Sequence, residues 1–209
     1  MRNILVISPH PDDEVIGCGG TLAKHIAAGE AVEVIFLTSG EKGGHGRSAE
    51  ETVKVRELES HAAARIMQFA NIRFWHEPDG AFIAAENNIT RLAEEIIQNP
   101  PLIIYAPHEQ EAHPDHREAA KMVSRALESL PDNMIKPSVR FYEVWTPIQQ
   151  IDEIEDITAF VDTKRAAILA YKSQCDVLAF DEAILGLNRY RGEMHSWPGG
   201  DYAEVFKNR

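Results

Sequence analysis

The sequence predicts an α/β fold, with one Rossmann-like domain over residues 1–209 and helices on both faces of a mostly parallel sheet. Two observations support this prediction. Short apolar runs alternate with helical patterns from the first residues onward, and such spacing implies right-handed crossovers between parallel strands. The runs are also almost continuously apolar, as expected for strands that helices cover on both sides.

Five apolar runs are the candidate strands, and they occupy residues 4–7, 32–37, 72–75, 102–105 and 139–144. Helical patterns occupy residues 19–28, 49–67, 88–98 and 116–130. The second helix has the clearest period, because apolar residues recur there at spacings of three and four, at Val55, Leu58, Ala62 and Ile66.

The last third of the chain is less regular. Residues 164–171 and 181–190 have helical character, and a short terminal segment follows at residues 201–206. We expect this part to fold over the carboxyl edge of the sheet and to shape the crevice there. No repeat, low-complexity stretch or linker divides the chain, which favours one domain.

The composition excludes several classes of function. The chain has 21 basic and 33 acidic residues, a net charge of −12 and no basic run, which argues against nucleic acid or anionic membranes as partners. Its two cysteines, Cys18 and Cys175, lack metal-site spacing and fit a reducing compartment. The first apolar run is too short for a signal peptide, and no stretch is long enough to span a membrane. We therefore expect a cytoplasmic protein in which Cys18 is a small packed residue.

A polar cluster follows the first strand directly and contains His10, Asp12, Asp13 and Glu14. Ligands of open α/β sheets collect at this carboxyl end. Imidazole and carboxylate together suit zinc, and a spare carboxylate beside the metal can act as a base. In an extended chain Asp12 and Asp13 point in opposite directions, so one can bind the metal while the other reaches its water.

A second cluster follows the run at residues 102–106 and contains His108, Glu109, Glu111, His113, Asp115 and His116. Each cluster alone would suit a solvated loop with a helix cap, but both together favour a metal centre. If a helix begins at Pro114, a usual place for proline, only His116 lies within it. One imidazole then completes the metal shell and the other donates a hydrogen bond or proton, with Asp115 orienting a ring. The spacing leaves open which histidine does which.

Glycines at positions 17, 19 and 20 lead into the first helix. They do not form the Gly-x-Gly-x-x-Gly pattern, and the nearby carboxylates would repel a pyrophosphate. The cluster therefore predicts close packing of helix on sheet rather than nucleotide binding.

The two histidine motifs, Ser-Pro-His-Pro-Asp-Asp-Glu at residues 8–14 and His-Pro-Asp-His at 113–116, resemble the LmbE-like or PIG-L family of zinc-dependent N-deacetylases. The resemblance covers nearly the whole chain. Less specific matches lie at residues 38–41, 78–80, 170–174 and 202–206, and at Arg56 with Glu59. Residues 142–147 are also similar to the branch that acts on glucosaminyl-malate.

The resemblance implies a divalent metal, Zn²⁺ with Fe²⁺ as an alternative, held by His10, Asp13 and His116. It implies that Asp12 is the general base, and that His113 stabilises the oxyanion and protonates the leaving amine, with Asp115 tuning the His113 ring. The expected reaction is hydrolysis of the acetamide on an N-acetylglucosamine derivative, giving a free amine and acetate.

The resemblance also implies substrate contacts at Arg56 and Asp79, with Glu41 near the same pocket. Simpler interpretations exist, because Arg56 and Glu59 suit a helix-surface pair and Asp79-Gly80 suits a plain turn. We expect Trp75, Trp145 and Trp197 to pack rather than to line the pocket. His45 lies in a glycine-rich loop, which suits a surface position or a lid.

Two alternatives remain open. The chain could be an amidase of the same chemistry acting on a larger thiol-conjugate amide, or a non-catalytic protein that binds metal or sugar. The presence of Asp12 argues against a pure binder, which needs no base. The expected partner is a small amino-sugar substrate, and the family resemblance implies a homo-oligomer.

Overall fold

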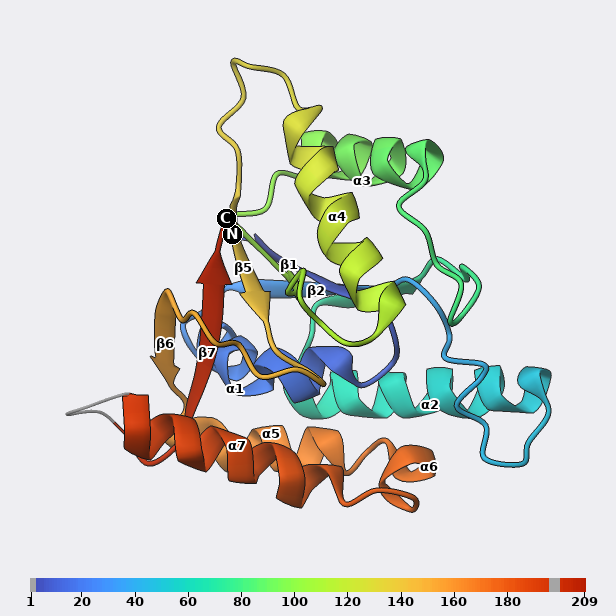
Figure 1. Ribbon diagram of the computed structural model, residues 1–209, viewed down its shortest axis with the longest axis vertical. Coiled ribbons are helices and arrows are strands. Elements are labelled where there is room, and N and C mark those ends of the chain that lie inside the picture. The colour runs from blue at the N-terminus through green and yellow to red at the C-terminus, as the bar shows by residue number, and fades with distance from the viewer. Residues whose placement is uncertain (1–2, 196–199) are drawn as a thin grey trace.

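The computed structural model describes residues 3–195 and 200–209, which form one sheet between layers of helices (Figure 1). The strands lie in the order β3-β2-β1-β4-β5-β7-β6. Their bounds are β1 Asn3–Ser8, β2 Ala31–Phe36, β3 Asn71–Phe74, β4 Ile103–Pro107, β5 Ser138–Tyr142, β6 Glu153–Asp156 and β7 Ala203–Asn208. The first five strands are parallel to one another, which confirms the predicted Rossmann-like, mostly parallel sheet.

The helices cover both faces of the sheet, as predicted. On one side lie α3 (Glu86–Gln98) and α4 (Pro114–Glu128), and on the other α1 (Asp13–Ala27), α2 (Ala49–Met67), α5 (Val161–Ile168), α6 (Lys172–Cys175) and α7 (Phe180–His195) (Figure 1). Strand β1 serves both cores, because Leu5 and Ile7 join the first and Ile4 and Val6 join the second. This alternation of side chains explains why the whole strand is apolar.

The last third differs from the prediction. Instead of folding over the carboxyl edge, its terminal segment forms β7, which pairs antiparallel with β5, and β6 pairs antiparallel with β7. These strands cover the edge of β5, whose backbone groups would otherwise lack partners on that side. Only the segment around α6 and the start of α7 reaches the crevice, as described below.

Helix α1 begins at Asp13, six residues before the predicted start. The predicted start at residue 19 coincides with a break in the helix, where Cys18 has φ −140° and ψ 16°. Asp13 and Glu14 therefore occupy a first helical turn, where the helix dipole favours carboxylates. The extended-chain argument for Asp12 and Asp13 is wrong. The two side chains diverge because Asp12 has a left-handed backbone, at φ 114°, and the helix starts immediately after it.

Helix α2 has the predicted bounds but buries a different face. Leu58 and Ile66 of the apolar pattern are 69% and 40% exposed, whereas Arg56 and Ser60 are buried. The polar face turns inward because its groups find partners there. Arg56 reaches the loop after β1, and Glu59 accepts hydrogen bonds from Ser173 in α6.

Two details of the first helix agree with the sequence analysis. A Cβ atom on Gly17 would lie 2.1 Å from the Tyr142 ring of β5, so the glycine permits the close helix–sheet packing that was expected. Cys18 is completely buried, and burial raises the pKa of its thiol, as befits a packed residue. No helix among the described residues is both long and apolar enough to cross a membrane.

Candidate metal centre and pocket

The two histidine motifs meet at the carboxyl ends of β1 and β4, which are neighbours in the sheet. The direction of strand succession reverses here, because β2 and β3 lie on one side of β1 while β4 and β5 lie on the other. Such a switch point leaves a crevice above the strand ends. The local sequence supports the arrangement, since Pro114 begins α4 with His113 as its N-cap and places His116 in the first turn.

Three buried side-chain atoms form a nearly equilateral triangle. Nδ1 of His10 lies 3.1 Å from Oδ2 of Asp13 and 3.2 Å from Nε2 of His116, and the last two atoms are 3.2 Å apart. Ligands of a tetrahedral zinc ion, at about 2.0–2.1 Å from the metal, are about 3.3 Å from one another. The donor set and its spacing therefore fit a small divalent cation.

The charges around this triangle favour a cation as well. Burial alone would lower the pKa of His116, but the Asp13 carboxylate raises it to about 9. His10 behaves similarly: burial opposes its protonation, while Asp115, Asp13 and Asp79 raise its pKa. Burial would raise the pKa of Asp13, yet the two imidazoles hold it well below its ordinary value. The cluster thus stabilises added positive charge, which a divalent cation can supply in place of protons.

The second nitrogen of His10 faces carboxylates. Its Nε2 lies 3.2 Å from Oδ1 of Asp79 and 3.2 Å from Oδ2 of Asp115. The same donor atoms form a second group close enough to contact one ion, as do those of His10, His113 and His116. We assign the triangle with Asp13 as the candidate site, because a ligating imidazole usually donates its other N–H to a carboxylate.

Asp12 lies in the same pocket and pairs with Arg56. Nη2 of Arg56 donates to Oδ2 of Asp12 at 3.0 Å and also to the carbonyl of Pro11, while Nη1 donates to the carbonyl of Gly40 at 3.2 Å. Burial raises the pKa of Asp12 to about 7, although Arg56 acts in the opposite direction. Arg56 is only 5% exposed, so the interpretation as a helix-surface pair is wrong.

His113 is half-buried at the start of α4. Its Nδ1 accepts a hydrogen bond from the backbone N–H of Asp115 at 3.3 Å, which leaves Nε2 as the protonated nitrogen of the neutral ring. Burial and the neighbouring imidazoles of His10 and His116 lower its pKa. The carboxylate of Asp115 contacts His10 and accepts hydrogen bonds from the N–H groups of Gly80 and Phe82.

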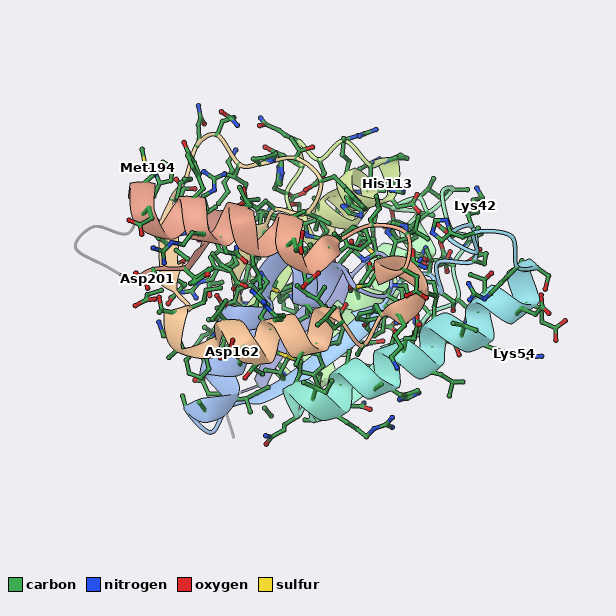
Figure 2. All side chains as sticks on the ribbon, turned by 90° about the horizontal axis from the view of Figure 1, so that it is seen from below. Lys42, Lys54, His113, Asp162, Met194 and Asp201 are labelled. Carbon is green, nitrogen blue, oxygen red and sulfur yellow. The ribbon has the colours of Figure 1, made fainter. Side chains whose placement is uncertain are left out.

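A cavity of about 330 Å³ opens beside these groups. Its lining includes four site residues, His10, Asp12, Asp13 and His113, and two predicted substrate contacts, Arg56 and Asp79. The remaining lining residues are Lys42, Gly43, His45, Gly80, Trp145, Gln174, Leu178 and Phe180. Figure 2 shows His113 and Lys42 nearer to the N-terminal end of α7 than to Met194 at its other end.

The predicted substrate contacts have different surroundings. Asp79 is more than a plain turn residue, because its carboxylate contacts His10 and accepts a hydrogen bond from the N–H of Lys42. Glu41 does not line the cavity; its carboxylate accepts a hydrogen bond from the N–H of Asp79.

Several lining residues escaped the sequence analysis. Trp145 was expected to pack, yet it is 50% exposed on the pocket wall beside Phe180. Leu178 and Phe180 carried no sequence signal at all, and Gln174 stood out only as part of a weak family match. Trp75 is buried in the core as expected, and Trp197 lies outside the described residues.

An α/β fold with imidazoles and carboxylates gathered at this switch point belongs to the class of hydrolytic enzymes with a candidate divalent-metal site. Within that class the chain belongs to the PIG-L family, since the family model described as "PIG-L: GlcNAc-PI de-N-acetylase" matches residues 5–127.

Similar proteins agree with this assignment. A probable N-acetyl-alpha-D-glucosaminyl L-malate deacetylase 2 from Bacillus anthracis is 27% identical over 83% of this chain and 81% of its own length. A 4-oxalmesaconate hydratase from Pseudomonas putida is 29% identical over 83% and 74%. The structure of a conserved protein from Thermus thermophilus superposes with a TM-score of 0.85 at 33% identity, covering 99% of this chain and 94% of the other.

Proposed function

We propose that this protein is a metal-dependent N-deacetylase that hydrolyses the acetamide of an N-acetylglucosamine derivative, releasing a free amine and acetate. The observation that carries the proposal is the triangle of His10, Asp13 and His116 with Asp12 lining the same cavity. The family supports the reaction, and the Bacillus relative supports N-acetylglucosaminyl malate as the substrate to test first.

His10, Asp13 and His116 would hold the metal, with Zn²⁺ as the expected ion and Fe²⁺ as the alternative. When bound, such an ion polarises an amide oxygen and lowers the pKa of water.

Asp12 would act as the general base by accepting a proton from the attacking water at a carboxylate oxygen. Two features support this role: the side chain lines the cavity, and Arg56 keeps one oxygen occupied so that the other is available. A base with a pKa near neutrality is efficient at physiological pH, and burial moves the pKa of Asp12 in that direction.

His113 would stabilise the oxyanion and then protonate the leaving amine. The hydrogen bond that its Nδ1 accepts from Asp115 leaves the protonated Nε2 as the donor. Asp115 would act by fixing this tautomer through its backbone and by holding His10 through its carboxylate.

Arg56 and Asp79 line the cavity and are proposed to contact sugar hydroxyls, with Glu41 holding Asp79 in place. The lining combines these charged groups with the apolar surfaces of Trp145 and Phe180. Such a mixed surface suits an amino sugar, which has both hydroxyls and apolar ring faces. A homo-oligomer remains a prediction, which light scattering can test.

A hydratase is the second candidate, because the Pseudomonas relative matches this chain about as well as the deacetylase does. An acetamide and an unsaturated carboxylic acid are chemically distinct substrates. Parallel assays of acetate release and of loss of the conjugated double bond distinguish the two functions.

The deciding experiment measures acetate and amine release from N-acetylglucosamine and its malate glycoside by the zinc-loaded protein. We expect turnover that Asp12→Asn reduces by a factor of about 10² to 10⁴, the usual contribution of a general base, with the bound metal unchanged. Full turnover by Asp12→Asn would exclude Asp12 as the base. Absence of hydrolysis over a broad acetamide panel would overturn the deacetylase proposal.

A further inference from the structure

Glu111 is a buried carboxylate to which the mechanism above gives no role. It lies between β4 and α4, is 1% exposed, and accepts hydrogen bonds from three consecutive backbone N–H groups. These belong to Val144, Trp145 and Thr146, at 2.6, 3.1 and 3.3 Å from its Oε1. The predicted strand at residues 139–144 ends early, at Tyr142, and beyond it Glu111 takes the place of a neighbouring strand as acceptor.

The other oxygen of Glu111 faces the candidate metal centre. Oε2 lies 3.6 Å from Nδ1 of His116, and both side chains are completely buried. Among the described residues, nothing accepts a hydrogen bond from this nitrogen. Because Nε2 of His116 points to Asp13 and His10, binding of a cation there places the ring hydrogen on Nδ1, with Glu111 as the nearest acceptor.

His108 does not compete for this oxygen. Its Nδ1 accepts a hydrogen bond from the N–H of Gln110, and its Nε2 lies 2.7 Å from the carbonyl of Thr146. The ring hydrogen of His108 therefore goes to that carbonyl, which adds a second tie to the same loop. Glu111 remains available to His116.

We propose that Glu111 is a positioning residue that orients His116 toward the metal and, with the same carboxylate, fixes the segment at residues 144–146 that carries Trp145 on the pocket wall. Metal affinity and the order of this wall then depend on one side chain. The inference rests on the proposed function insofar as His116 is a metal ligand. It adds a link between the metal centre and the surface that meets the substrate.

Glutamine provides a sharp test, because its side chain has one acceptor oxygen where glutamate has two. In Glu111→Gln that oxygen can serve the three amides or His116, but not both. We expect Glu111→Gln to lose either zinc affinity, by about 10- to 100-fold as is typical for partners of ligating histidines, or protection of the amides of residues 144–146 from hydrogen exchange. Glu111→Ala should lose both.

The matched control is Glu109→Gln, an exposed carboxylate two residues away that pairs with Lys207 at 3.4 Å. It should retain the zinc affinity and the exchange pattern of the original protein. Zinc affinity is measured by competition with a chelator, and amide exchange by mass spectrometry on the full chain. Circular dichroism identifies any variant that fails to fold, and Glu111→Gln, which preserves shape, then decides the question.

Wild-type zinc affinity together with wild-type amide protection in Glu111→Gln would overturn the inference. Neither readout requires turnover, so the inference stands or falls separately from the deacetylase assay. If the original protein binds no divalent cation, the proposed function and this inference fail together. If it binds zinc and only the Glu111 variants behave like the control, this inference alone fails.

Discussion

Individual side chains at the site illustrate how surroundings assign chemical roles. His113 and His116 are three residues apart in one motif, yet His116 lies inside α4 and His113 caps it. Only His116 joins the 3.1–3.2 Å triangle with His10 and Asp13. The sequence identified both imidazoles as chemically important, but their division of labour depends on where the helix begins.

This geometry predicts distinct effects on metal content. His10→Ala or Asp13→Ala should lose zinc, because each removes one corner of the triangle. His113→Ala should retain zinc and lose turnover, because its ring lies outside the triangle. Metal analysis of the purified variants by mass spectrometry checks both expectations. A metal-free His113→Ala protein would mean that the two histidines of the motif have exchanged roles.

Arg56 leads to a prediction about pH. Burial raises the pKa of Asp12 to about 7, and Arg56 lowers it, so that removal of Arg56 raises the pKa further. The base must be ionised to accept a proton, and activity is therefore lost as pH falls through this pKa. A bound cation lowers the pKa in both proteins. We expect the acid limb of the kcat profile of Arg56→Met to lie at higher pH than that of the original protein.

Arg65→Met is the control for this experiment, because Arg65 is exposed on the same helix. Its acid limb should coincide with that of the unmodified protein. An unshifted limb in Arg56→Met, in a variant that remains folded, would show that Arg56 does not act on Asp12.

At the scale of elements, the contact between α1 and β5 depends on the missing side chain of Gly17. A Cβ atom there would lie 2.1 Å from the ring of Tyr142, which donates a hydrogen bond to the carbonyl of Ile7 in β1. The ring has little freedom to move, and the helix that carries Asp13 would be displaced instead.

Gly17→Ala should therefore lower the free energy of unfolding by about 1–3 kcal/mol, as overpacking in a core usually does. Gly186→Ala in α7 is the control, because a Cβ atom there meets nothing within 4 Å. It should be neutral or slightly stabilising, since alanine favours helix by about 1 kcal/mol over glycine. Urea unfolding measures both, and equal stability of the two variants would contradict the packing argument.

At the scale of the whole molecule, a buried ion pair joins the two ends of the chain. Nζ of Lys164 in α5 donates to Glu204 in β7 at 2.7 Å and to the carbonyl of Ile16 at 2.8 Å. Glu204 in turn accepts hydrogen bonds from the N–H groups of Gly20 and Thr21, which the break at Cys18 leaves without helical partners. These contacts support our proposal that residues 1–209 form one domain.

Lys164→Met should lower the free energy of unfolding by about 3–5 kcal/mol, because it leaves the Glu204 carboxylate buried without a counter-charge. The double variant with Glu204→Gln should recover part of this loss. Lys121→Met is the control, because Lys121 pairs with Glu118 at the surface and such pairs contribute at most about 1 kcal/mol. Equal losses in Lys164→Met and Lys121→Met, measured by urea unfolding, would contradict this account.

The residues that bear the proposed chemistry and the parallel sheet that presents them were predictable from the sequence alone. Both depend on local signals, because apolar strands and the polar runs directly after them can be read along the chain. The buried face of α2, the pairing of Arg56 with Asp12, and the pocket wall at Trp145, Leu178 and Phe180 were not predictable. They arise from contacts between residues far apart in sequence, and only the tertiary structure decides which distant groups become partners of a buried charge.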